Sequence, residues 1–190
     1  TPVNYRLGPG DQLQIEVWGA SEANITQKVT PDGYISIPNV GPVNVNGLTV
    51  QAATNRIKAK LSQIYSGMNT SNVNLSTNVK VSLGQIRTIQ VNIMGEVAQP
   101  GTYALSSFST VFHALYKAGG MSRMGSLRNI KVVRGGRTVA TVDVYDYIIN
   151  GRSHSDIRLQ EGDVILASPY EALVLIKGKV KRPMYYEMKS

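Results

Sequence analysis

The side chains that could carry acid–base, nucleophilic or metal chemistry do not form a recognisable set in this sequence. The chain has no cysteine, and its two histidines, His113 and His154, have neither H-x-H nor H-x-x-x-H spacing. A zinc site is therefore not expected. The carboxylates are scattered without a pair suited to general acid–base work, and neither a G-x-S-x-G nucleophile turn nor a Walker-type phosphate loop is present. The sequence predicts a protein that is not an enzyme and that binds no cofactor or metal.

Basic side chains are the most prominent chemical feature. The formal net charge is +8, and residues 87–190 contribute +6 of it, with fourteen Lys or Arg against eight Asp or Glu. Two clusters dominate: Arg123, Arg128, Lys131, Arg134 and Arg137, and then Lys177, Lys179, Lys181 and Arg182. They form either a solvated face or a surface for an anionic partner such as an acidic glycan, a lipid headgroup or a nucleic acid. Nucleic acid is not expected, because no helix-turn-helix or RNA-binding signature accompanies them.

The strands of the first part follow from its hydrophobic pattern. A turn at residues 8–11 precedes apolar residues that alternate with polar ones over 13–17, which predicts a half-buried strand. A second turn at 29–33 leads into short strands over 34–45, so this part resembles a small β-meander. A further strand is expected over 79–83.

Two main helices are expected to pack against these strands and those that follow. Thr49 is a suitable N-cap for a helix over about 50–65. Ser109 or Thr110 caps a second helix that runs to about Ala118 and ends at a pair of glycines. No apolar run approaches the roughly 18 residues of a membrane-spanning helix.

The remaining elements complete a small sheet. Residues 89–97 form a strand, and residues 130–143 form a hairpin around two glycines. A short helix near 144–149 and a last strand at 164–166 follow. The order β-α-β-β-(α)-β predicts an α+β fold with one main helix across a mixed sheet.

One segment of the sequence has a similar second copy. Residues 94–105 (MGEVAQPGTYAL) align without a gap on residues 177–188 (KGKVKRPMYYEM), at a constant offset of 83 residues. The matched pairs are Gly95 and Gly178, Val97 and Val180, Pro100 and Pro183, and Tyr103 and Tyr186. A constant offset shared by Gly, Pro and Tyr indicates an internal repeat.

Two turns of the chain also share a sequence motif. Residues 7–13 and 159–165 both contain L-x-x-G-D followed by an apolar strand. We expect Asp11 and Asp163 to bond nearby backbone N–H groups and so to fix these turns. A catalytic role is less favoured, because neither has a histidine or a second acid nearby.

Taken together, these motifs resemble the bacterial outer-membrane polysaccharide export proteins. The first part resembles the polysaccharide export domain, and the second resembles a soluble-ligand-binding β-grasp (SLBB) module. The residues of these motifs, to which we assign structural roles, are Gly8, Pro9, Gly10, Asp11, Pro31, Asp32, Gly33, Gly95, Pro100, Gly101, Gly119, Gly120, Gly162 and Asp163. The expected domains are an export domain over 1–86, a first β-grasp domain over 87–170 and the start of a truncated second β-grasp repeat over 171–190. The resemblance also allows the strand around 5–17 to join the β-grasp sheet.

The resemblance implies a periplasmic ring of identical subunits that conducts capsular or exopolysaccharide across the outer membrane of a Gram-negative bacterium. Its expected partners are the polysaccharide, copies of itself, and an inner-membrane copolymerase or tyrosine kinase. Family members are commonly lipoproteins, yet no lipidated N-terminal Cys is present here, and the second repeat ends after its first strand and turn. We therefore expect this sequence to be an internal fragment, attached to the outer membrane through segments that lie outside it. The basic clusters would contact polysaccharide, lipid headgroups or neighbouring subunits.

Two other functions compete with export. One is a soluble glycan- or small-ligand-binding periplasmic module that acts as a sensor or accessory factor. The other is a glycan lyase or hydrolase, which would need a carboxylate pair that the sequence does not display.

Overall fold

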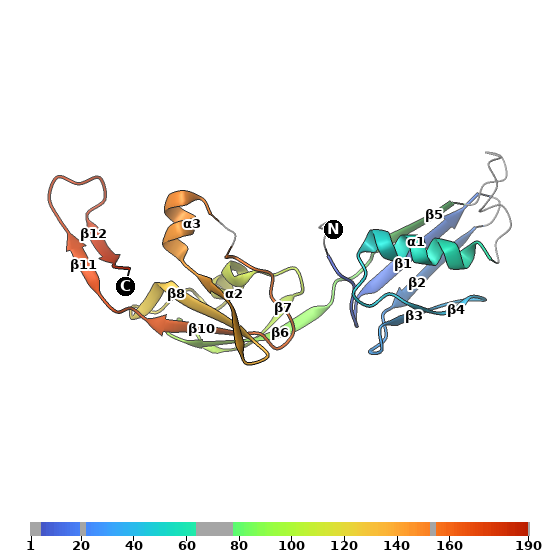
Figure 1. Ribbon diagram of the computed structural model, residues 1–190, viewed down its shortest axis with the longest axis horizontal. Helices are drawn as coiled ribbons and strands as arrows, with labels where there is room; N and C mark the ends of the chain where they lie inside the picture. The colour runs from blue at the N-terminus through green and yellow to red at the C-terminus, as the bar shows by residue number, and fades with distance from the viewer. Residues whose placement is uncertain (1–4, 20–21, 64–77, 153–154, 190) are drawn as a thin grey trace. The chain divides into compact units, whose positions relative to one another are not determined.

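The computed structural model describes residues 5–19, 22–63, 78–152 and 155–189. The chain forms two compact units, Thr1–Arg87 and Thr88–Ser190 (Figure 1). This division falls one residue beyond the end of the expected export domain. Each unit combines strands with at least one helix, so the predicted α+β class is confirmed.

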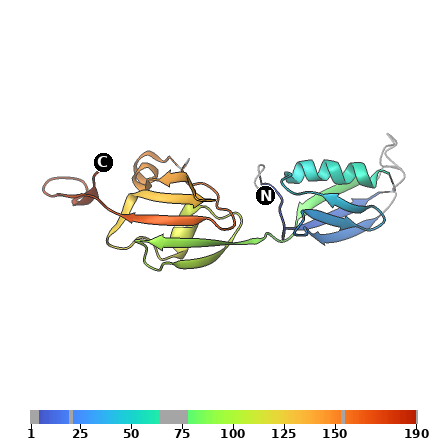
Figure 2. The same cartoon turned by 60° about the horizontal axis from the view of Figure 1, so that its bottom comes forward.

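The first unit is built from a three-stranded sheet, a separate hairpin and one helix. Its elements are β1 (Gln12–Trp18), β2 (Ala23–Lys28), β3 (Tyr34–Ile37), β4 (Gly41–Asn44), α1 (Val50–Leu61) and β5 (Asn78–Leu83). The sheet order is β2-β1-β5, with both pairings antiparallel, and β3 forms a separate antiparallel pair with β4. In Figures 1 and 2, α1 lies along one face of these strands.

The apolar stripe of α1 explains why this helix forms where it does. Ala53, Ile57 and Leu61 are fully buried, and their spacing places them on one face of the helix. As predicted, Thr49 is the N-cap, and its hydroxyl accepts a hydrogen bond from the backbone of Ala52 at 3.2 Å. The helix ends at Leu61, earlier than the predicted end near residue 65, which itself lies outside the described residues.

Strand β1 belongs to the first unit's own sheet. It is the central strand, flanked on both sides by antiparallel partners along its length. Its alternating residues Leu13, Ile15 and Val17 are buried in that unit. In this chain, therefore, the strand does not join the β-grasp sheet as the resemblance had allowed, because β2 and β5 already occupy both of its edges.

The second unit is a five-stranded sheet with helices and a terminal hairpin. Its elements are β6 (Thr88–Gly95), β7 (Gly101–Ser106), α2 (Val111–Lys117), β8 (Gly125–Arg134), β9 (Arg137–Val142), α3 (Val144–Asn150), β10 (Val164–Pro169), β11 (Leu173–Ile176) and β12 (Met184–Glu187). The sheet order is β7-β6-β10-β8-β9, and β10 lies parallel to β6 and antiparallel to β8. The first and last long strands thus meet at the centre of the sheet, as Figure 2 shows.

One apolar core holds this sheet to α2. Val91 and Ile93 of β6 and Ile165 of β10 are fully buried, together with Val111 and Ala114 of α2. No helix in the part of the chain that the structure describes combines the length and the apolar character needed to cross a bilayer.

The two L-x-x-G-D turns have the same internal geometry. The Oδ2 atom of Asp11 accepts from the backbone of Gly8 at 2.9 Å, and the Oδ2 atom of Asp163 accepts from the backbone of Gln160 at 2.8 Å. In each turn the aspartate N–H donates back to the carbonyl of the same partner at 3.2 Å. The expected hydrogen bonds from nearby backbone N–H groups to both aspartates are present.

Each turn aspartate is completely buried and is neutralised by an arginine from a distant strand or strand end. Asp11 pairs with the Nη1 atom of Arg87 at 2.8 Å and also accepts from the hydroxyl of Tyr5 at 2.7 Å. Asp163 receives two hydrogen bonds from Arg134, from Nε and Nη2, both at 2.7 Å. Burying a carboxylate costs much free energy unless it is paired with a cation and hydrogen-bonded, and both aspartates meet this condition.

The internal repeat is reproduced in hydrogen-bonding detail. In β6–β7, Val91 pairs with Tyr103, and in β11–β12, Val174 pairs with Tyr186, each 83 residues further on. The Tyr103 hydroxyl donates to the carbonyl four residues earlier at 2.6 Å, and the Tyr186 hydroxyl does the same at 2.9 Å. The two copies of the repeated segment therefore form hairpins with the same register.

Replacing the buried aspartate of the first turn tests its importance. We expect Asp11→Ala to lower the free energy of unfolding of the first unit by about 3–5 kcal/mol, because Arg87 and the Gly8 N–H lose their shared acceptor. Urea denaturation followed by the fluorescence of Trp18 reports on this unit, since the chain has a single Trp, which lies in β1. The matched control is Asp32→Ala, an exposed turn aspartate. Equal stability of the two variants would contradict the role assigned to Asp11.

Two equivalent glycines of the repeat provide a second test. Gly95 has φ 85° and Gly178 has φ 101°, so alanine is strained at both positions by about 1–3 kcal/mol. At Gly95, however, a Cβ would collide with the backbone carbonyl of Ala167 in β10, whereas at Gly178 no atom lies within 4 Å. We expect Gly95→Ala to accelerate amide hydrogen exchange across β6 and β10 far more than Gly178→Ala does across β11. Similar effects of the two substitutions would show that backbone strain alone matters.

Candidate functional site

Most of the predicted anion-contacting side chains are available for a partner. In the described part of the chain, seven of the nine make no ion pair or hydrogen bond through their side chains. These seven are Arg123, Lys131, Arg137, Lys177, Lys179, Lys181 and Arg182. All are exposed except Lys131, which is half-buried. They can contact an anion without first breaking an internal interaction.

Arg134, one of the nine predicted anion-contacting residues, is bonded within the chain. Its guanidinium is engaged by Asp163, and Nη2 also donates to the carbonyl of Arg158 at 3.3 Å. The hydrogen bonds to Asp163 raise the pKa of Arg134 above its ordinary value, although burial acts in the opposite direction. A raised arginine pKa keeps the cation charged until strongly alkaline pH, so the pair is not switched by arginine titration in the ordinary range. In this chain Arg134 stabilises a turn.

Arg128 is likewise held by several partners. It pairs with Asp143 at 3.0 Å, and its guanidinium lies over the ring of Tyr145, 4.1 Å from the centroid. Its Nε atom donates to the main-chain carbonyl of Glu187 at 2.9 Å. This arginine therefore joins β8 to the start of α3 and to β12.

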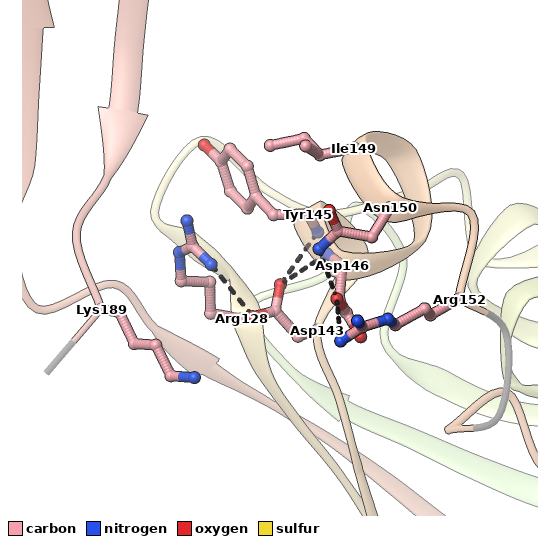
Figure 3. Close-up of a pocket in the computed structure, with 8 residues that line it drawn as sticks. All are labelled: Arg128, Asp143, Tyr145, Asp146, Ile149, Asn150, Arg152 and Lys189. Carbon is pink, nitrogen blue, oxygen red and sulfur yellow. Dashed lines mark hydrogen bonds and ion pairs between the residues drawn. The ribbon is translucent and has the colours of Figure 1, made fainter.

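A polar cleft opens beside Arg128 (Figure 3). Its volume is about 400 Å³, and a smaller cleft of about 270 Å³ shares Arg128, Asp143 and Lys189 with it. The lining residues drawn in Figure 3 are Arg128, Asp143, Tyr145, Asp146, Ile149, Asn150, Arg152 and Lys189.

The short helix α3 positions one wall of this cleft. Asp143 caps its start by accepting from the backbone of Tyr145 at 2.9 Å, and Gly151 ends it in the left-handed conformation, with φ 65°. On the helix, Asn150 donates to Asp146 at 2.7 Å. The predicted helix near 144–149 is thus confirmed, with both ends defined by local interactions.

The cleft has the chemistry of a binding site for a charged, hydroxylated ligand. Arg152 lies 3.9 Å from Asp146, with 66% of its side chain exposed, and Lys189 is exposed at the opposite wall. Both cations can reach a ligand carboxylate, while the oxygens of Asp146 and Asn150 can accept from hydroxyls. Among the described residues, no cluster of three or more His, Asp or Glu could hold a metal ion.

Sequence reasoning did not single out Arg152, Lys189 or Tyr145, because none belongs to a dense basic cluster or a motif. The available signal was Asp143, an N-cap residue type immediately before the predicted short helix. His113 has a local role, since its Nδ1 atom accepts from the backbone of Thr110 at 3.2 Å at the start of α2. His154 lies outside the described residues.

The family-motif residues lie in turns and at element ends. Gly119 and Gly120 follow α2 with φ 79° and 86°, and the Gly120 N–H donates to the carbonyl of Leu115 at 2.9 Å. Gly33 has φ 86° in the turn before β3, and Gly162 has φ 78° in the turn before β10. Positive φ at these positions is a backbone conformation that glycine adopts more readily than other residues.

Comparison with known proteins covers nearly the whole chain. Residues 1–82 match the family model described as polysaccharide biosynthesis/export protein, and residues 89–166 match that of the SLBB domain. The chain contains a polysaccharide export domain followed by an SLBB domain. The resemblance recognised in the sequence is thereby confirmed.

Two named relatives are homologous to this chain along both of its domains. It is 33% identical over 188 residues to the polysialic acid transport protein KpsD of Escherichia coli, a match that covers 98% of this chain and 32% of KpsD. It is 25% identical over 205 residues to the EPS I polysaccharide export outer membrane protein EpsA of Ralstonia solanacearum, covering 94% of this chain and 52% of EpsA. The chain thus spans about a third of KpsD and about half of EpsA.

Two neighbouring arginines of the SLBB domain are expected to respond differently to substitution. Arg134→Ala should lower the free energy of unfolding of the second unit by about 3 kcal/mol or more, because it leaves the buried Asp163 without a cation. Arg137→Ala, at the other side of the same hairpin, should change it by less than about 0.5 kcal/mol. Thermal unfolding followed by near-ultraviolet circular dichroism of the tyrosines measures both. Equal effects would refute the distinction.

Proposed function

We propose that this chain is part of a periplasmic subunit that forms a ring and conducts polysaccharide across the outer membrane without making or breaking bonds. The observation that carries the proposal is the joint match of an export domain and an SLBB domain, in one order, to proteins named for polysaccharide transport and export. Ring closure would use heterologous contacts between copies. In the full-length protein, a lipid anchor and a membrane segment would hold the ring at the outer membrane, above an inner-membrane copolymerase or kinase.

The proposed substrate class is an acidic polysaccharide. The seven cations without internal partners all lie in residues 87–190, which carry a net charge of +6. One relative is named as a transporter of polysialic acid, a polymer with a carboxylate on each sugar. Exposed cations interact weakly and individually with such a chain, which suits a polymer that must keep moving.

We further propose that residues 171–190 begin a second β-grasp repeat. The support is the shared register of β6–β7 and β11–β12 and the equivalent tyrosine hydrogen bonds. In β6 the residues Val91 and Ile93 are fully buried, whereas their equivalents Val174 and Ile176 are 44% and 38% exposed. An apolar face of this kind would be covered by the rest of the repeat.

Genetic complementation tests the export role. We expect deletion of the full-length gene to abolish polysaccharide at the cell surface, with polymer retained inside the cell, and the intact gene to restore it. Surface polysaccharide is measured with a specific antibody or lectin. Normal surface polysaccharide in the deletion strain would overturn the proposal.

The oligomeric state separates export from the competing binding module. Native mass spectrometry of the full-length protein in detergent should show a closed ring of several copies. A strictly monomeric protein with a saturable oligosaccharide site would instead support a sensor or accessory factor.

Charge reversal tests the substrate class. Lys179→Glu with Lys181→Glu should weaken binding of polysialic acid by about fivefold or more, because two attractive contacts become repulsive. The matched control is Lys58→Glu with Lys60→Glu on α1, which are also exposed and change the net charge equally. Neutral dextran serves as the uncharged probe. Equal losses for both variants would mean that only overall charge matters.

A further inference from the structure

The two copies of the repeated hairpin differ systematically on one face. In β6–β7, four residues point away from the buried core of the sheet and are exposed or half-buried. At the equivalent positions of β11–β12, polar or small residues are replaced by apolar, aromatic or acidic ones. The four positions, first copy before second, are Gln90 and Leu173, Asn92 and Leu175, Thr102 and Tyr185, and Ala104 and Glu187.

This changed face of β11–β12 is directed at the preceding SLBB module. Leu173 and Tyr185 line a cleft of about 560 Å³ together with Leu127 and Tyr170. On the same face, Glu187 reaches the first residues of β8. Leu173, Leu175 and Tyr185 remain 39%, 38% and 58% exposed, so the contact on this face is made chiefly by Glu187.

The carboxylate of Glu187 is the anchor of that contact. It is 7% exposed, and it accepts a hydrogen bond from the hydroxyl of Ser126 and one from the backbone of Leu127 at 2.7 Å. The Ser126 oxygen itself already accepts from the backbone of Arg128 at 3.1 Å and of Asn129 at 2.9 Å. Both N–H groups donate to the Ser126 oxygen and cannot accept a hydrogen bond. The hydroxyl proton of Ser126 therefore needs a third group as its acceptor. Glu187 supplies this acceptor for a serine that is 1% exposed.

The backbone of Glu187 makes two further hydrogen bonds to the module. Its N–H donates to the hydroxyl of Tyr145 at 3.1 Å, and its carbonyl accepts from the Nε atom of Arg128 at 2.9 Å. Tyr145 and Arg128 are themselves stacked, and Arg128 pairs with Asp143. One residue of β12 therefore bonds to β8 and to α3 through its carboxylate, its N–H and its carbonyl.

We propose that the surface formed by the start of β8 and the start of α3 is the docking site for the hairpin that follows it, and that Glu187 locks this joint. The occupant is the segment 171–189 of the same chain, seated on that surface in the structure. The lock makes the SLBB module and the hairpin move as one body. This proposal does not depend on the export function, because it concerns contacts within one chain.

A distance measurement between two labels tests the joint. The chain has no cysteine, so Thr138→Cys in β9 and Lys181→Cys in the hairpin turn accept spin labels at two exposed positions only. We expect a single narrow distance distribution by pulsed electron paramagnetic resonance. Glu187→Ala should raise the undocked population about tenfold or more, seen as a broad second component, because it leaves buried donors without an acceptor. The matched control, Glu171→Ala, removes an exposed carboxylate next to the same hairpin and should leave the distribution narrow.

A double-mutant cycle makes the assignment specific. Ser126→Ala should also broaden the distribution, and Ser126→Ala combined with Glu187→Ala should be no broader than Glu187→Ala alone, because both remove the same hydrogen bond. A broad distribution in the unsubstituted pair, equal effects of Glu187→Ala and Glu171→Ala, or additive effects in the cycle would each overturn the proposal. Loss of the near-ultraviolet signal of the whole unit in Glu187→Ala would overturn it too, since Glu187 would then belong to the core of the module.

Discussion

A buried carboxylate held by a distant arginine organises each unit of this chain. Asp11 is bonded to Arg87 across 76 residues, and Asp163 to Arg134 across 29. Neither aspartate is exposed at all. Because an unpaired ion in such a site is strongly destabilising, the turn, the strand after it and the arginine backbone can be stable only together.

This constraint also divides the basic side chains into two groups. Arg87, Arg134 and, in part, Arg128 are engaged by carboxylates and hold the fold together. The other seven cations of the two clusters make no side-chain ion pair or hydrogen bond among the described residues, and six of the seven are exposed. These are the cations that an acidic polymer could contact. Net charge alone does not separate the two groups, since a cation in an ion pair contributes little field at a distance.

The internal repeat shows how one hairpin can serve two structural purposes. The residues that define its register are retained, so β6–β7 and β11–β12 pair in the same way. The residues on its outer face have changed, and in the second copy one of them, Glu187, bonds to the preceding module. Glu187 is the clearest case, because its equivalent, Ala104, is exposed and has no comparable contact. The residues that set the register of the hairpin and the residue that bonds to the preceding module thus lie on different faces of the same strands.

Local patterns were sufficient to predict the α+β class, most of the elements and the two turns that the aspartates fix. Alternation at Leu13, Ile15 and Val17 and the cap at Thr49 depend only on neighbours in the sequence, which is why they could be recognised there. The family resemblance rested on the same local motifs.

Only the tertiary structure decided which charged side chains are bonded within the chain and which face solvent. Arg134 and Arg137 stand three residues apart and look alike in the sequence, yet the first lies against a buried aspartate and the second faces solvent. The arginine that neutralises Asp11, the cleft beside α3 and the burial of Glu187 all depend on contacts between residues far apart in the chain. Hydrophobic periodicity says which face of a strand is buried, but an ion pair across 76 residues exists only once the sheets have formed.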